Sequence, residues 1–146
     1  MEQAVITIRE GNIEEAVAVS QKIPEFSAPY PEAEYVKRLE QVSHLILIAC
    51  IEEELVGFKV GYAKESTFYS WMGGVLPAYR GHGIAKKLAK TQEIWVKSHS
   101  YTTITFKTRN QHIGMFIFAL KNGFQVIGFT PDTTVNRNRI YLQKNL

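Results

Sequence analysis

The chain has 146 residues, of which 45% are hydrophobic, and it carries 17 basic and 14 acidic residues for a net charge of +3. A chain of this length can bury one sizeable core, so we expect a single domain over residues 1–146. The basic residues are spread along the chain, which argues against a nucleic-acid partner, and no stretch is apolar over the ~18 residues that a membrane helix needs.

The first half of the chain predicts a strand, two helices and three further strands. Residues 4–10 alternate with β-branched side chains and indicate a strand, and Asn12 is a suitable N-cap for the helix that follows. Three prolines between residues 24 and 31 exclude a helix interior there, and a second short helix is expected over 31–41. The next strands are expected over residues 44–51, 55–64 and 68–76.

The second half adds two helices and three strands. An amphipathic helix is expected over residues 84–98, a strand over 102–108, a largely buried helix over 111–123, and final strands over 124–130 and 139–144. The strand-helix-strand unit over residues 68–107 requires a parallel pair, whereas the hairpins before it are antiparallel. The order βααβββαβαββ therefore predicts an α/β fold, with a mixed, mostly antiparallel sheet and helices on both faces. The adjacent Gly73 and Gly74 indicate a bulge or a close backbone approach.

The stretch VLPAYRGHGIAKKL, residues 75–88, joins a strand to the amphipathic helix. The free amides and the positive dipole end of such a helix bind anions, and Gly81 and Gly83 let a ligand approach the backbone closely. Arg80 adds a positive charge. The loop is neither a Walker A loop, which needs Gly-Lys-Ser/Thr, nor a dinucleotide loop, which needs glycine or alanine where Lys86 stands. A plain strand-to-helix turn also explains the glycines, so both readings stay open on the loop alone.

The wider pattern resembles the GNAT N-acetyltransferase superfamily. Residues 75–85 are similar to its R/Q-x-x-G-x-G/A signature, and Asn110 with the helix end at residues 121–124 is similar to its second motif. The predicted element order also resembles the fold of that family over essentially the whole chain. The resemblance implies that acetyl-CoA is the acetyl donor and that its binding residues are Val75, Leu76, Arg80, Gly81, His82, Gly83, Ile84, Ala85, Lys86 and Asn110.

The resemblance implies direct attack of an amine on the thioester in a ternary complex. Family members that use a glutamate base carry it at a position near Tyr69, and many carry a tyrosine acid where this chain has Ala119. Tyr69, Tyr101, Tyr141 or water are the candidates that remain for moving protons. A non-catalytic acyl-CoA-binding sensor on the same fold is the alternative that these substitutions suggest, and an unrelated nucleotide-phosphate binder is a third hypothesis.

The acceptor is expected to be a small primary amine or an amino group of a peptide or protein. Tyr30, Glu34 and Trp71 are candidates for binding it, because carboxylates and aromatic rings attract a cationic amine. Core packing explains Trp71 equally well, and a solvated helix face explains Glu34.

The remaining features of the sequence bear on metals, compartment and assembly. The four histidines have no metal-ligand spacing, so we expect no metal site. The lone Cys50 cannot form an internal disulfide and the N-terminus lacks a signal-peptide pattern, so we expect a cytoplasmic protein without a membrane partner. A homodimer remains open.

Overall fold

A seven-stranded mixed sheet forms the centre of the structure, a computed structural model that describes residues 5–146. Its strands are β1 (Ile6–Glu10), β2 (His44–Ile51), β3 (Glu54–Lys64), β4 (Thr67–Val75), β5 (Thr103–Arg109), β6 (Gln125–Thr130) and β7 (Arg139–Asn145), in the spatial order β1-β2-β3-β4-β5-β7-β6. The helices are α1 (Ile13–Ser20), α2 (Glu32–Leu39), α3 (Ile84–Ser98) and α4 (Ile113–Lys121). The predicted order of elements is confirmed. The first residue of the strand expected over 4–10 lies outside the described residues.

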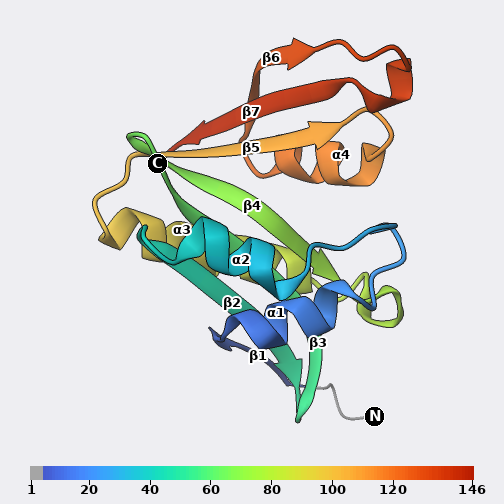
Figure 1. Cartoon of the computed structure of the whole chain (residues 1–146). Helices are drawn as coiled ribbons and strands as arrows, with labels where there is room; N and C mark the ends of the chain where they lie inside the picture. Colours follow the sequence, from blue (N-terminus) through green and yellow to red (C-terminus); the bar gives the residue numbers. More distant parts are fainter. Residues whose placement is uncertain (1–4) are drawn as a thin grey trace.

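Helices α1 and α2 cover one face of the sheet, and α3 and α4 lie on the other (Figure 1). Successive side chains of β2 point to opposite faces, so Ile46 and Ile48 pack under α1 and α2 while Leu45 and Leu47 pack against α3. This explains why β2 is apolar at every position from Leu45 to Cys50. The predicted mixed sheet with helices on both faces is confirmed. None of the helices in the described part of the chain has the length and apolar character needed to cross a membrane.

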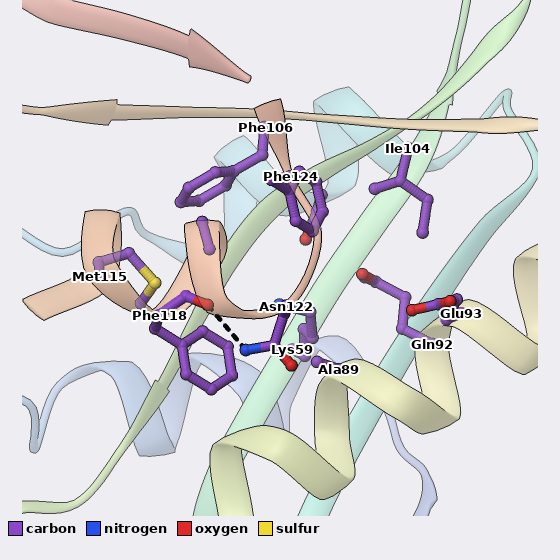
Figure 2. Close-up of a pocket in the computed structure, with 12 residues that line it drawn as sticks. Lys59, Ala89, Gln92, Glu93, Ile104, Phe106, Met115, Phe118, Asn122 and Phe124 are labelled. Carbon is purple, nitrogen blue, oxygen red and sulfur yellow. Dashed lines mark hydrogen bonds between the residues drawn. The ribbon is translucent and has the colours of Figure 1, made fainter. Parts of the chain in front are cut away.

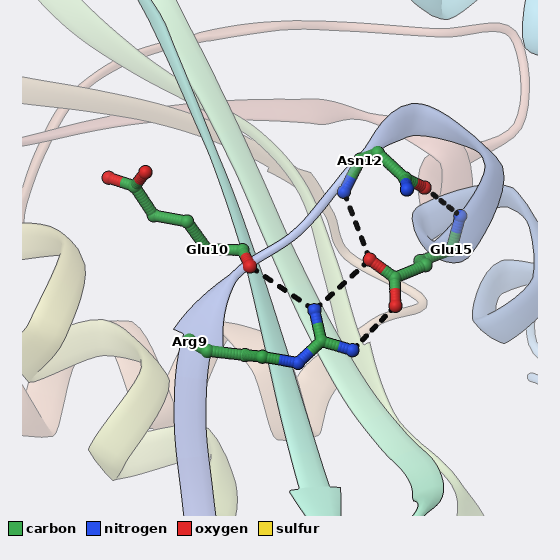
Figure 3. A network of polar contacts seen from close by, with 4 residues as sticks. All are labelled: Arg9, Glu10, Asn12 and Glu15. Atoms are coloured by element: carbon green, nitrogen blue, oxygen red, sulfur yellow. Dashed lines mark hydrogen bonds and ion pairs between the residues drawn. The ribbon is translucent and has the colours of Figure 1, made fainter.

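The start of α1 is held by reciprocal hydrogen bonds between Asn12 and Glu15 (Figure 3). The Asn12 side chain accepts a hydrogen bond from Glu15 N (2.9 Å), and the Glu15 carboxylate accepts one from Asn12 N (3.1 Å). This capping box satisfies two amides at the helix start, as the predicted N-cap requires. Arg9 of β1 also pairs with Glu15 and lowers the pKa of that carboxyl. The turn from β1 into α1 is therefore fixed by local chemistry.

Strands β4 and β5 form the predicted parallel pair over only three residues each. Their register runs from Phe68 opposite Ile104 to Ser70 opposite Phe106, and beyond Ser70 the two strands diverge (Figure 1). Beyond Ser70, that edge of β4 therefore has no strand paired with it. At this split two neighbouring strands of the sheet stop pairing, so the sheet is not regular there.

The irregularity in β4 lies at Trp71, two residues before the glycine pair. The β3–β4 register skips Trp71, because Val60 pairs with Met72 while Gly61 pairs with Ser70. Gly73 and Gly74 are in regular register, so the expected bulge at these two residues is wrong. The close approach is present, since a Cβ on Gly74 would lie 2.5 Å from Ile23 Cδ1 in the α1–α2 link.

Helix α4 is more exposed than its apolar sequence suggested. Ile113 is 63% exposed and Ile117 46%, and Ala119 is the buried residue of the helix. The physical reason is the split, because α4 packs beside β5 (Figure 1) after that strand has turned away from β4. The expectation of a largely buried helix over 111–123 is therefore wrong.

Candidate functional site

The loop between β4 and α3 leaves the first turn of α3 open. Gly81 and Gly83 have φ angles of +85° and +79°, and Gly83 is the N-cap without a side chain that could satisfy the helix amides. A Cβ on either glycine meets nothing within 4 Å, so the space in front of the helix is free. The first intrahelical bond runs from Lys87 N to Gly83 O (3.0 Å). The amides of residues 84–86 therefore have no partner within the helix, and such an end binds anions.

Arg80 holds this loop against two other parts of the chain. Its Nε donates to Val75 O (3.0 Å), and its terminal nitrogens donate to the Glu25 carboxylate at 2.7 and 2.9 Å. These hydrogen bonds lower the pKa of Glu25. Both side chains are nearly half exposed, so the pair adds little stability. Arg80 thus joins the α1–α2 link to the end of β4. The side chain of His82 in the loop is exposed, as are those of Ala85 and Lys86 in the first turn of α3.

Other residues that the sequence singled out around the loop are already engaged with the protein. Leu76 N donates to Val56 O (2.9 Å), so this amide is not free for a ligand. Asn110 follows β5 at the same end of the sheet, and its Nδ2 donates to Val135 O (2.9 Å) in the loop before β7. The structure therefore brings the β4 end and the α3 loop together, whereas the Asn110 side chain supports a different loop.

A cavity of about 30 Å³ lies at the point where β4 and β5 part, between α3 and α4 (Figure 2). Lys59 of β3 and Gln92 of α3 line it together with Ser70 of β4 and Ala119 of α4. Gln92 is 2% exposed, and its Nε2 donor has no hydrogen-bond partner. Burial lowers the pKa of Lys59 to about 8. Two side chains that carry hydrogen-bond donors therefore line a space that admits one or two water-sized groups.

Sequence reasoning did not find Lys59 or Gln92. Gln92 has a local signal, because it stands four residues from both Leu88 and Val96 on the buried stripe of α3. A polar residue on such a stripe calls for a partner or a ligand. Lys59 is harder to single out from the sequence. Alternation along β3 places its side chain on the face opposite Phe58, but only the structure shows that α3 covers this face.

On the opposite face, Tyr30, Glu34 and Trp71 do come together, around an arginine that sequence reasoning missed. The rings of Tyr30 and Trp71 have centroids 5.3 Å apart, and the Arg38 guanidinium lies 4.4 Å from the Trp71 ring and 5.3 Å from the Tyr30 ring. Arg38 Nε donates to Glu34 Oε1 (2.9 Å), and its Nη1 donates to Tyr62 OH (3.1 Å). The cation over these rings is therefore supplied by the protein itself. The i,i+4 spacing of Glu34 and Arg38 was the available signal.

The three tyrosines considered for proton transfer do not form one group. Lys107 Nζ lies 5.3 Å from the Tyr69 ring centroid and 5.7 Å from that of Tyr141. Tyr101 instead packs against Phe68 in the core beneath α3 (ring centroids 5.7 Å apart). Burial raises the pKa of Tyr69 to about 12, so its hydroxyl is protonated at pH 7. Within residues 5–146 no three His, Cys, Asp or Glu side chains converge to hold a metal ion.

Comparison with known proteins agrees with this geometry. The sequence model of the Acetyltransferase (GNAT) family matches residues 16–124. Ard1 from Thermoplasma volcanium has a similar structure, with a TM-score of 0.82 and 16% identity over 97% of each chain. No curated protein sequence matches the chain significantly.

Two further solved structures are similar and contain a bound ligand. PaiA N-acetyltransferase from Thermoplasma acidophilum, in complex with coenzyme A, has a TM-score of 0.75 and 20% identity over 97% of this chain and 99% of its own. YncA from Salmonella typhimurium, called a putative acetyltransferase and solved with acetyl-CoA, has a TM-score of 0.78 and 13% identity over 97% and 94%. At these identities the likeness is one of fold. The match over residues 16–124 identifies the family: the chain belongs to the GNAT family of acetyltransferases.

Proposed function

We propose that this chain is an acetyl-CoA-dependent N-acetyltransferase that transfers the acetyl group to an amine within a ternary complex. The observation that carries the proposal is the open end of α3, where the free amides of residues 84–86 and the bare Gly81 and Gly83 fit a pyrophosphate. Exposed Lys86 adds a positive charge beside it. Family membership and the coenzyme A complexes of the Thermoplasma acidophilum and Salmonella proteins support this donor.

From the α3 loop, the pantetheine arm of the donor would follow the edge of β4 that β5 leaves free. The pairing of β4 with β5 ends at Ser70, so backbone groups beyond it face the split. Because the Leu76 amide is engaged with Val56, the donor's amides would pair with β4 before that residue. A β4 amide at the same edge would donate to the thioester oxygen as negative charge develops there.

The acceptor amine would attack from the face covered by α1 and α2, beside Trp71 and Tyr30. A lysine-like amine has a pKa of about 10.4, so its neutral form at pH 7 costs about 4.6 kcal/mol. Tyr69 does not accept this proton at pH 7, because its pKa of about 12 keeps the hydroxyl protonated. The proton would therefore pass to a water molecule.

A thiol-release assay with polyamines, aminoglycosides and lysine peptides tests the proposed function. We expect acetyl-CoA to release free thiol only with an amine present, and mass spectrometry to find one added acetyl group on that amine. Isothermal calorimetry with acetyl-CoA alone is the companion measurement. Tight binding without turnover on any amine would contradict an enzyme and favour an acyl-CoA-binding protein, and absence of binding would contradict the donor itself.

Arg38→Ala is expected to change acceptor preference without changing donor affinity. Removing the guanidinium frees the faces of Tyr30 and Trp71, and it frees Glu34 for a ligand cation. A cation over aromatic rings gains about 1 kcal/mol, so the KM for a polyamine should fall roughly fivefold. Lys37→Ala, the exposed neighbour on the same helix, is the matched control and should leave KM unchanged. An unchanged polyamine KM in Arg38→Ala would show that the acceptor does not reach these rings.

A further inference from the structure

The cavity at the β4/β5 split (Figure 2) contains two donors for which the protein supplies no acceptor. Gln92 Nε2 is buried and unpartnered, and Lys59 takes part in none of the ion pairs between described residues. The one carboxylate that lines the cavity, Glu93, pairs with Lys144 Nζ at 2.9 Å. A cation and an amide donor without acceptors fit a ligand atom that carries electron pairs or negative charge.

The position of the cavity suits the sulfur end of the donor. Gln92 follows Ile84 by eight residues, or about 12 Å along α3, so a chain anchored at the α3 loop reaches the cavity through the split. The cavity has room for a terminal group and not for a whole arm, since it holds about 30 Å³. Its β4 wall is Ser70, the last residue that pairs with β5. An arm running along the free edge of β4 would therefore end at this wall.

The α4 side of the same cavity lacks a proton donor. Ala119 lines it with a methyl group, and Asn122 uses its Nδ2 to donate to Phe118 O (2.7 Å). Lys59 comes from β3 instead, and its side chain is among those that line the cavity (Figure 2). Among the residues that line the cavity, Lys59 on the sheet is the one cationic side chain.

We propose that Lys59 is a catalytic residue that binds the donor sulfur and protonates the departing coenzyme A thiolate, an inference that rests on the proposed function. As the amine nitrogen bonds to the carbonyl carbon, the C–S bond breaks and its electron pair goes to sulfur. The ammonium of Lys59 gives one proton to sulfur and becomes a neutral amine. The acceptor nitrogen loses one proton to water, and Lys59 later takes one from water, so charge and atoms balance.

The acidity of Lys59 suits this role. A pKa of about 8 leaves roughly ten protonated lysines for each neutral one at pH 7 and lies close to the thiol value of about 8.5. The charged groups around it are few, since Glu93 is the other ionisable residue of the cavity and is held by Lys144. Because the protonated form is the active one, this step should slow as the pH rises through about 8.

Lys59→Met tests the proposal, with Lys97→Met at an exposed position of α3 as the matched control. We expect kcat to fall about 100-fold in Lys59→Met with the KM for acetyl-CoA nearly unchanged, and the alkaline loss of rate near pH 8 to disappear. Lys97→Met should keep both the rate and the pH profile of the parent. An unchanged kcat and an unchanged alkaline limb in Lys59→Met would overturn the proposal.

A binding experiment reads the same contact without turnover. The ultraviolet absorbance of the thiolate, followed against pH in the protein–coenzyme A complex, should give a thiol pKa roughly one to two pH units lower in the parent than in Lys59→Met. Desulfo-coenzyme A, which lacks the sulfur, should bind both proteins equally. Equal thiol pKa values, or an acetyl group found on Lys59 by mass spectrometry, would overturn the role. Failure of coenzyme A to bind the parent protein would instead refute the proposed function.

Discussion

Gly83→Asp is expected to weaken acetyl-CoA binding about 100-fold or more, whereas Gly83→Asn weakens it less than about tenfold. Both side chains tolerate the left-handed backbone that Gly83 adopts at φ +79°, and both enter space where a Cβ meets nothing within 4 Å. They differ by one negative charge at the mouth of α3. A carboxylate about 5 Å from a phosphate charge costs roughly 3 kcal/mol at an effective dielectric of 20, which corresponds to about two orders of magnitude in affinity.

Isothermal calorimetry with acetyl-CoA measures this difference, and thermal melting of both variants shows that the fold is kept. The pair separates charge from shape, because asparagine and aspartate have nearly the same volume. If the two variants bind acetyl-CoA equally well, no phosphate lies at the α3 loop and the donor assignment is wrong. If both lose binding equally, the loop needs a bare glycine for geometry and the charge argument fails.

The elements predicted best from the sequence are those whose defining residues lie within the element or directly beside it. Helix α3 was expected over 84–98 and has those bounds, because leucine and isoleucine spacing marks its buried side and Gly83 marks its start. Strand β2 was also expected with its observed bounds, since an apolar run with a polar residue at each side describes a strand buried on both faces. The Asn12 cap and the glycines of the α3 loop were likewise recognisable from neighbouring residues alone.

The features that sequence missed depend on which segments lie side by side. In the sequence, Lys59 is one lysine in an alternating strand, and only the folded structure shows that α3 covers its side of the sheet. The apolar residues of α4 suggest burial, but β5 turns away from β4 and leaves part of that helix exposed. Arg38 stands among surface charges of a helix, and its place over Trp71 follows only from how α2 packs on β4. Asn110 was assigned from a motif, yet its side chain is bound to Val135. Packing decides each of these cases.

The split between β4 and β5 connects the two halves of the proposed reaction. The open end of α3 and the cavity with Lys59 lie on the α3 side of the sheet, whereas Trp71, Tyr30 and Arg38 lie on the other side. Donor and acceptor would therefore meet across the gap without competing for the same surface. The short parallel pair that ends at Ser70 sets where they meet, so its stability bears directly on the site.

Phe68→Ala is expected to lower the free energy of unfolding by about 3–5 kcal/mol, the largest stability effect that we predict. Phe68 is fully buried and pairs with Ile104 at the start of the parallel segment. Its ring packs against Trp95 and Tyr101, with centroids 5.6 and 5.7 Å away. Truncation leaves a cavity among rigid aromatic rings, which relax little. Urea denaturation measures the loss, which is a large part of the 5–15 kcal/mol typical of a folded domain.

Phe129→Ala is the matched control, because it makes the same chemical change on β6, where the side chain is 66% exposed. Substitutions at such positions stay within about 0.5 kcal/mol, so the difference between the two variants isolates burial from chemistry. Loss of the Phe68 ring should also loosen the point where β4 and β5 part, and Phe68→Ala should therefore bind acetyl-CoA more weakly even at temperatures where it remains folded. Equal stability of the two variants would mean that the core beneath α3 does not hold the split in place.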